Sequence, residues 1–140
     1  MATYDTVSIH PIGVVASALR SRENAPRQPF HDAPEASLMI DERFIQAIDG
    51  INPGSEILVL TWLHQASRNI LKVHPGHDAR NPLAGVFSTR SPDRPNPIGL
   101  HRVKVLAIED QRQLKVDHLE AIDGTPILDI KPVLNDVRGQ

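Results

Sequence analysis

Residues 85–100, GVFSTRSPDRPNPIGL, constrain the fold more than any other stretch of this chain. Pro92, Pro95 and Pro97 fall within six residues of one another. Each proline fixes its own φ, removes a backbone donor and pushes the preceding residue toward extended geometry. The stretch can therefore be neither a helix nor a central strand. Much of its conformational freedom is lost before folding, so the sequence predicts a stiff loop.

Apolar patterning elsewhere predicts mostly strands. One short helix is expected over about 42–49, with Asp41 as N-cap, a staple between Ile40 and Ile45, and a stop at Gly50. The predicted strands are 6–16 (a pair broken at Pro11 and Gly13, or one bent strand), 56–64 with both faces apolar, a short one at 85–89, a hairpin of 98–110 and 114–122, and a last one within 124–130. Long loops at 17–34 and 65–83 separate them. This pattern predicts a mainly β fold, a small barrel or sandwich of mostly antiparallel strands with one short helix and long ligand-binding loops.

Composition bounds the remaining possibilities. The length of 140 residues fits one domain over residues 1–140. The chain has no cysteine, no apolar run long enough for a membrane span and no signal-peptide pattern at its start, so a soluble, cytoplasmic protein without membrane contact is expected. A net charge of −2 argues against a broad nucleic-acid-binding surface. Residues 80–104 are nevertheless basic, with five cations against Asp93.

Two arginines stand in the proline-rich loop. Arg90 and Arg94 each offer a rigid fork of donors that suits a carboxylate or a phosphate. A stiff loop lowers the entropy cost of holding such an anion, and prolines leave carbonyls without a local donor that suit amino groups or hydroxyls of a ligand. The alternative is an ordinary loop whose arginines pair with surface acids. The residues favour a site for a small anionic or zwitterionic ligand.

Other polar clusters are less specific. A DGT turn is expected at Asp123, Gly124 and Thr125. Such turns are common, so the spacing alone favours a structural role. His64 ends the apolar strand and either lines the mouth of a pocket or is an ordinary edge residue. The HPGHD stretch (74–78) fits a turn better than a metal site, so no metal is expected. Asp129 and Lys131 share one strand face and could pair with each other or with the arginines.

Four blocks resemble the TsaA/TrmO-like (YaeB-like) family. They are PRQ at 26–28, LHQ at 63–65, the stretch 85–100, and DGTPILDIKP at 123–132, in the family's order. The resemblance implies a small β-barrel, usually a homodimer with the cofactor site near the subunit interface. It also implies an S-adenosyl-L-methionine-dependent methyltransferase, with S-adenosyl-L-homocysteine as product, that N6-methylates threonylcarbamoyladenosine in tRNA.

The resemblance also implies a set of site residues. The cofactor pocket would be lined by Pro26, Arg27, Gln28, His64, Gln65, Arg90, Leu100, Asp123, Gly124 and Thr125. Loop support or substrate contact would fall to Ser91, Arg94, Asn96 and Lys131. No residue stands out as the base that removes the acceptor proton. We take Asp129 as the carboxylate for that role.

Two departures from the family pattern keep other functions open. The family commonly reads DIKPY, whereas Val133 stands here in place of the tyrosine. Longer members continue into a C-terminal accessory domain implicated in tRNA contacts, and no such domain is expected here. The alternatives are therefore a methyltransferase for a different, small acceptor and a non-catalytic S-adenosyl-L-methionine-binding module.

Overall fold

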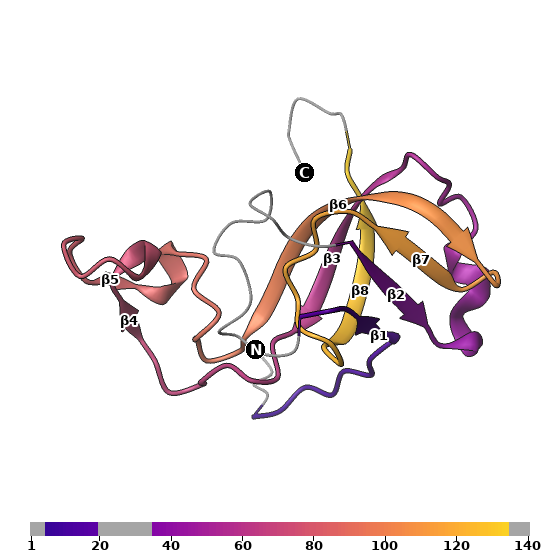
Figure 1. Cartoon of the computed structure of the whole chain (residues 1–140). Coiled ribbons are helices and arrows are strands. Elements are labelled where there is room, and N and C mark those ends of the chain that lie inside the picture. The colour runs from indigo at the N-terminus through magenta and orange to yellow at the C-terminus, as the bar shows by residue number, and fades with distance from the viewer. Residues whose placement is uncertain (1–4, 20–34, 135–140) are drawn as a thin grey trace.

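Six antiparallel strands form the body of the protein in a computed structural model, which describes residues 5–19 and 35–134 (Figure 1). The strands are β1 (Gly13–Ala16), β2 (Ala36–Ile40), β3 (Glu56–Trp62), β6 (Ile98–Glu109), β7 (Gln113–Val116) and β8 (Pro126–Pro132). They pair in the order β1-β2-β7-β6-β3-β8, and β8 pairs again with β1, so the sheet closes on itself. The mainly β, antiparallel expectation is confirmed.

The alternation of β6 explains how the sheet encloses a core. Val103 and Val105 point inward and are almost completely buried, whereas Arg102 and Lys104, which alternate with them, face solvent. β3 follows the same rule: its inner positions are buried, and its outer positions after the exposed Glu56 are half-buried, which agrees with apolar residues on both faces. The inward residues of the six strands form one hydrophobic cluster that includes Val15, Leu38, Val59, Leu114 and Ile127.

Several predicted elements differ from the structure. The strand expected over 6–16 begins only at Gly13, and β2 was not predicted. The helix is present at Glu42–Ile48 (η2) with Asp41 as its N-cap, but it is a 3₁₀ helix. The short strand expected at 85–89 is wrong, because the chain makes a two-residue strand β5 (Ala84–Gly85) and then a 3₁₀ turn, η4 (Val86–Ser88).

Residues 63–97 form an arm that extends away from the closed sheet (Figure 1). It contains β4 (Lys72–Val73), which pairs with β5, and the 3₁₀ turn η3 (Pro75–His77). The long loop expected at 65–83 therefore has a small framework of its own. No helix within residues 5–19 and 35–134 is long and apolar enough to cross a membrane.

Candidate functional site

Three long connections leave the closed sheet at the same end. Because neighbouring strands are antiparallel, the ends of β1, β3 and β7 lie beside the starts of β2, β6 and β8. The connections between them are residues 17–35, the arm, and residues 117–125. The predicted cofactor residues lie in these connections, except Leu100, which lies near this end of β6. Topology thus brings together segments that are far apart in the sequence.

Arg94 holds the proline-rich loop together from within. Its guanidinium donates to the carbonyls of Val86 at 2.9 Å, Thr89 at 3.1 Å and Ser91 at 3.0 Å. Its backbone N–H donates to the Ser67 carbonyl at 3.0 Å. These bonds give Arg94 the loop-support role, one of the two expected for it, and they occupy donors that an anion would otherwise use.

Ser67 ties the start of the arm to the proline-rich loop. The Asp93 carboxylate accepts a hydrogen bond from the Ser67 backbone N–H at 2.8 Å. The Ser91 hydroxyl donates to the Asp93 carbonyl at 3.3 Å and accepts from the Asp93 N–H at 3.2 Å. These bonds fix residues 91–94 against residue 67, so the two sides of the arm are joined where it meets the sheet.

Arg68 makes a second clamp that the sequence did not indicate. Its Nε donates to the Pro95 carbonyl at 2.7 Å, and its terminal nitrogen donates to the Asn96 side-chain oxygen at 2.9 Å. Its guanidinium also lies over the Trp62 ring, 5.2 Å from the centroid. The only signal for this role is an arginine six residues after the strand tryptophan, which is too common a spacing to be read.

The carbonyls of two prolines have intramolecular donors. The Pro95 carbonyl accepts from Arg68, and the Pro97 carbonyl accepts from the Leu63 N–H at 2.8 Å. The expectation that proline leaves these carbonyls open for a ligand is therefore wrong. The donors come from across the arm, where spacing along the chain cannot reveal them.

Arg90 differs from its neighbours in this loop. Its side chain is exposed and makes no hydrogen bond or ion pair with any residue in the described ranges. The loop around it is fixed by Arg94, Ser91 and Arg68. Arg90 is thus a free cation on a rigid support, which is the arrangement that suits capture of a small anion.

The DGT turn joins β8 to the segment that follows β1. The Asp123 carboxylate accepts from the Ser17 N–H at 3.0 Å, and the Asp123 N–H donates to the Leu19 carbonyl at 2.6 Å. The buried Thr125 hydroxyl donates to the Ile122 carbonyl at 2.6 Å, and Gly124 has φ of 84°. These bonds give the turn a structural role, and its place in the cofactor pocket stays a prediction. The turn also fixes the residues that lead directly into 20–34.

Two further blocks of predicted cofactor residues belong to the long connections. His64 and Gln65 form an exposed turn directly after β3 at the loop end of the sheet. Pro26, Arg27 and Gln28 lie outside the described residues.

Leu100, Asp129 and Lys131 lie on the outer wall of the sheet. Leu100 is 47% exposed and stands opposite Leu60, whose partner on the other side is Asp129. Lys131 approaches the Asp129 carboxylate at 3.3 Å, so these two pair with each other, one of the two outcomes expected. Asp129 lies within β8 and not in one of the three connections.

The sequence did not predict two polar features, a buried hydrogen bond and a half-buried carboxyl. Thr61 Oγ1 and His101 Nε2 share a buried hydrogen bond of 2.8 Å, beside Gly99 on the inner face of β6. Burial lowers the pKa of His101 to about 4. Glu120, in the connection before the DGT turn, has a raised pKa caused by burial, and its buried Oε2 has no hydrogen-bond partner among the described residues. A carboxyl of this kind is typical of functional sites as well as of strained structural ones.

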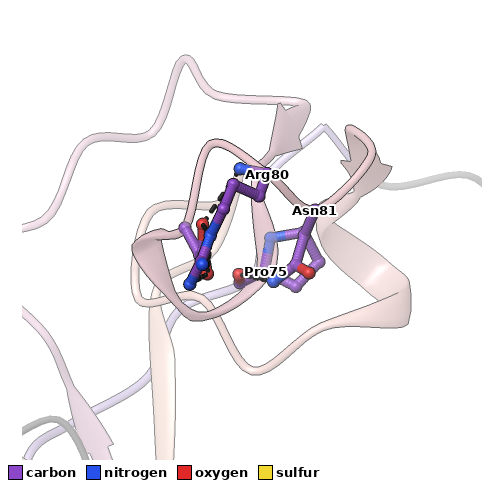
Figure 2. Close-up of polar contacts among 4 residues, drawn as sticks. Pro75, Arg80 and Asn81 are labelled. Atoms are coloured by element: carbon purple, nitrogen blue, oxygen red, sulfur yellow. Dashed lines mark hydrogen bonds and ion pairs between the residues drawn. The ribbon is translucent and has the colours of Figure 1, made fainter.

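The HPGHD stretch is a turn at the far part of the arm. Asn81 donates to the Pro75 carbonyl at 2.8 Å, and Arg80 pairs with Asp78 at 2.7 Å, as Figure 2 shows. His74 Nδ1 lies 2.7 Å from the Asn81 carbonyl. Within residues 5–19 and 35–134, no three His, Asp or Glu side chains are grouped as metal ligands would be.

Two open hollows lie away from these loops. They have volumes of about 610 and 450 Å³ and lie around η2 and the residues that follow it. The second includes Lys131, and neither contains a predicted cofactor residue. The second hollow is lined by Asp49, Glu56 and Lys131, but the family-like blocks of the sequence lie elsewhere, so the three connections are the better candidate for the cofactor site.

Comparison with known families shows which family this chain belongs to. The sequence profile described as the tRNA-methyltransferase O N-terminal domain matches residues 14–137. This chain belongs to the TrmO N-terminal domain family. The match covers the closed sheet, the arm and the DGT turn, so the loops at one end of the sheet are part of the family's shared structure.

Two relatives of similar length have names that mention S-adenosyl-L-methionine binding. The chain is 44% identical over 124 residues to a protein of Archaeoglobus fulgidus named "S-adenosyl-L-methionine-binding protein", covering 88% of this chain and 86% of that one. It is 43% identical over 131 residues to a "Probable S-adenosyl-L-methionine-binding protein" of Methanothermobacter thermautotrophicus, covering 94% and 93%.

A solved TrmO structure shares the fold. The crystal structure of TrmO from Pseudomonas aeruginosa superposes with a TM-score of 0.73 at 33% sequence identity. The match covers 94% of this chain and 58% of that one. This member of the TrmO family thus spans somewhat more than half the length of the TrmO chain it matches.

Proposed function

We propose that this protein is an S-adenosyl-L-methionine-dependent methyltransferase that acts on tRNA and forms S-adenosyl-L-homocysteine. The acceptor would be N6 of a threonylcarbamoyladenosine-type adenosine. The family match carries the proposal, together with the free Arg90 on its rigid loop. We further propose a cytoplasmic homodimer whose closed sheet acts as a small barrel carrying the site.

The side chains present fit a ligand of this kind. The cofactor has a carboxylate, an ammonium group and a ribose diol, which call for a cation, an anion and polar groups in separate places. Arg90 would hold the carboxylate, while Asp123 and the His64–Gln65 turn would hold amino or hydroxyl groups. Pro26, Arg27, Gln28, Gly124, Thr125 and Leu100 would complete the pocket.

The protein's task in such a reaction is mainly to align the reactants. When bound, S-adenosyl-L-methionine supplies a methyl group on a sulfonium, which is already a strong leaving group. The chain must therefore hold the acceptor nitrogen in line and exclude misaligned poses, and a stiff loop does this at low entropic cost. Arg94, Ser91 and Asn96 would act by keeping that loop in place. For the proton on the acceptor, Glu120 is a better candidate than the salt-bridged Asp129, because its pKa is raised and it lies in the loops at the site end of the sheet.

Arg90→Ala tests the proposed pocket. We expect the Kd for S-adenosyl-L-homocysteine to rise roughly ten- to a hundredfold, equivalent to about 1.5–3 kcal/mol for a charge-assisted bond. Isothermal titration calorimetry measures it. Arg80→Ala is the matched control, since Arg80 is an exposed arginine of the same arm that pairs with Asp78 instead. Unchanged affinity in Arg90→Ala would remove Arg90 from the pocket.

Arg68→Ala tests whether the clamp positions the loop. We expect a loss of roughly five- to tenfold in cofactor affinity, because two hydrogen bonds and the stack on Trp62 disappear while Arg90 itself remains. Arg68→Lys should recover part of the affinity, since a lysine keeps one bond and the cation. The thermal midpoint should stay within a few degrees, because Arg68 is exposed. An Arg68→Ala variant that binds normally would contradict a positioning role.

The acceptor is tested separately. Purified protein, radiolabelled cofactor and tRNA from cells that lack the modification should give labelled tRNA. Transfer to a small metabolite but not to tRNA would favour the small-acceptor alternative. Tight binding without transfer to any acceptor would favour a cofactor-binding module.

A further inference from the structure

One face of the arm presents a large aromatic side chain to solvent. Phe87 is 81% exposed, although Val86 directly before it is 2% exposed. Leu71 is 68% exposed, and its backbone lies beside that of Val86, because the Val86 N–H donates to the Leu71 carbonyl at 3.0 Å. Lys72 follows Leu71 and pairs with Gly85 in the two-stranded sheet. We use the name Phe87 face for the exposed part of the arm around Phe87, which includes the exposed residues Leu71 and Lys72 of the adjoining strand segment.

The backbone that carries Phe87 is fixed by several hydrogen bonds. The Val86 carbonyl accepts from the Thr89 N–H, from the Thr89 hydroxyl and from the Arg94 guanidinium, at 2.9–3.0 Å. The Ser88 hydroxyl donates to the Gly85 carbonyl at 2.8 Å. A ring held so firmly in solvent gains nothing for the fold, and this is the arrangement of a preorganised contact residue.

Charge indicates what kind of partner this face fits. Residues 63–97 contain five Lys and Arg against two Asp, whereas the rest of the chain contains ten Lys and Arg against fifteen Asp and Glu. The arm is therefore positive on a protein that is otherwise negative. Lys72 makes no hydrogen bond or ion pair with any of the residues that the structure describes, so its charge is available.

We infer that the Phe87 face is a contact surface for single-stranded RNA, with Phe87 stacked on an unpaired base and Lys72 near the backbone phosphates. Aromatic rings beside cations are how proteins hold unstacked bases, and stacking needs no particular base. Phe87 lies three residues before Arg90, so RNA on this face would bring a base next to the proposed cofactor loop. The inference rests on the proposed tRNA substrate and adds the surface that receives it.

The test is fluorescence anisotropy with a labelled RNA hairpin that has an unpaired loop, in the absence of cofactor. We expect Phe87→Ala to weaken binding by roughly tenfold, in line with the loss of one stacked base. Phe87→Tyr should retain affinity, whereas Phe87→Leu should behave like Phe87→Ala, because leucine keeps the apolar area but cannot stack. Lys72→Gln should weaken binding and flatten its salt dependence. Blunt duplex RNA should bind more weakly and respond to Lys72→Gln but not to Phe87→Ala.

A control variant separates stacking on Phe87 from a general effect of removing exposed apolar surface. Val7→Ala changes a side chain that is 71% exposed outside the arm and should leave RNA binding unchanged. Normal hairpin binding by Phe87→Ala or Phe87→Leu, or no binding by the unmodified protein, would overturn the inference. If sedimentation shows that Phe87→Ala splits a dimer which Phe87→Leu preserves, the face is a contact between copies and the inference is wrong. If the proposed function is wrong, the unmodified protein will not bind the cofactor or transfer a methyl group. Hairpin binding is measured without cofactor, so it tests the inference separately.

Discussion

Lowering the pH from 7 to about 4 should cost this protein about 3 kcal/mol of stability through one side chain, His101. Its imidazole is buried against Thr61 inside the sheet, and burial lowers its pKa from 6.5 to about 4. The unfolded chain therefore binds a proton at a pH where the folded protein does not. Stability from this group is complete above about pH 6.5 and is lost as the pH falls toward 4.

Urea unfolding at a series of pH values measures this effect. The midpoint should fall steeply between pH 6.5 and 4.5, above the range where most carboxylates titrate. His101→Gln is the control, because an amide can still bond Thr61 but carries no titrating group. The variant should be less stable at pH 7 yet lose little more as the pH drops. An equally steep fall in His101→Gln would assign the acid sensitivity to other groups.

Gly13→Ala should destabilise the fold by about 3 kcal/mol, near the upper end of the range for overpacking. A Cβ at Gly13 would stand 2.3 Å from the Met39 carbonyl oxygen and 3.0 Å from the Ile40 Cα. Both contacts are with backbone, so no side-chain rotation can relieve them. β1 would have to move away from β2, although β1 also closes the sheet through β8.

Gly85→Ala provides the matched control for this prediction. Gly85 is also a strand glycine with negative φ, but nothing lies within 4 Å of a Cβ built on it. Its replacement should change the denaturation midpoint little. If Gly13→Ala were as stable as Gly85→Ala, the contact between β1 and β2 would be looser than the structure describes.

The sequence predicted those elements whose signals are local. β3, the β6–β7 hairpin and β8 are marked by apolar patterning and turn residues, and η2 is marked by Asp41 and Gly50. Strand β2, which was not predicted, has only five residues and is followed directly by the N-cap of η2. No turn residues separate β2 from the helix, so the sequence does not mark where the strand ends. η4 was misread because Val86 and Phe87 suit a strand, whereas a guanidinium eight residues away holds their turn.

The site was predictable only in outline. The proline-rich loop and the DGT turn follow from residue types and spacing, whereas Arg90 and Arg94 were given the same role. The different roles of the arginines could not be predicted, because the carbonyls that accept hydrogen bonds from Arg68 and Arg94 come near them only in the folded arm. The Thr61–His101 pair joins residues forty positions apart across two strands, and no pattern along the chain reveals it.

The stack of Arg68 on Trp62 has a practical consequence. Trp62 is the one tryptophan in the sequence, and it lies at the point where the arm leaves the sheet. Its emission therefore reports on one place only, and the cation over its ring couples that emission to the position of the proline-rich loop. Any ligand that shifts this loop should change the intrinsic fluorescence, so binding and its rate can be followed by stopped-flow on the unlabelled protein.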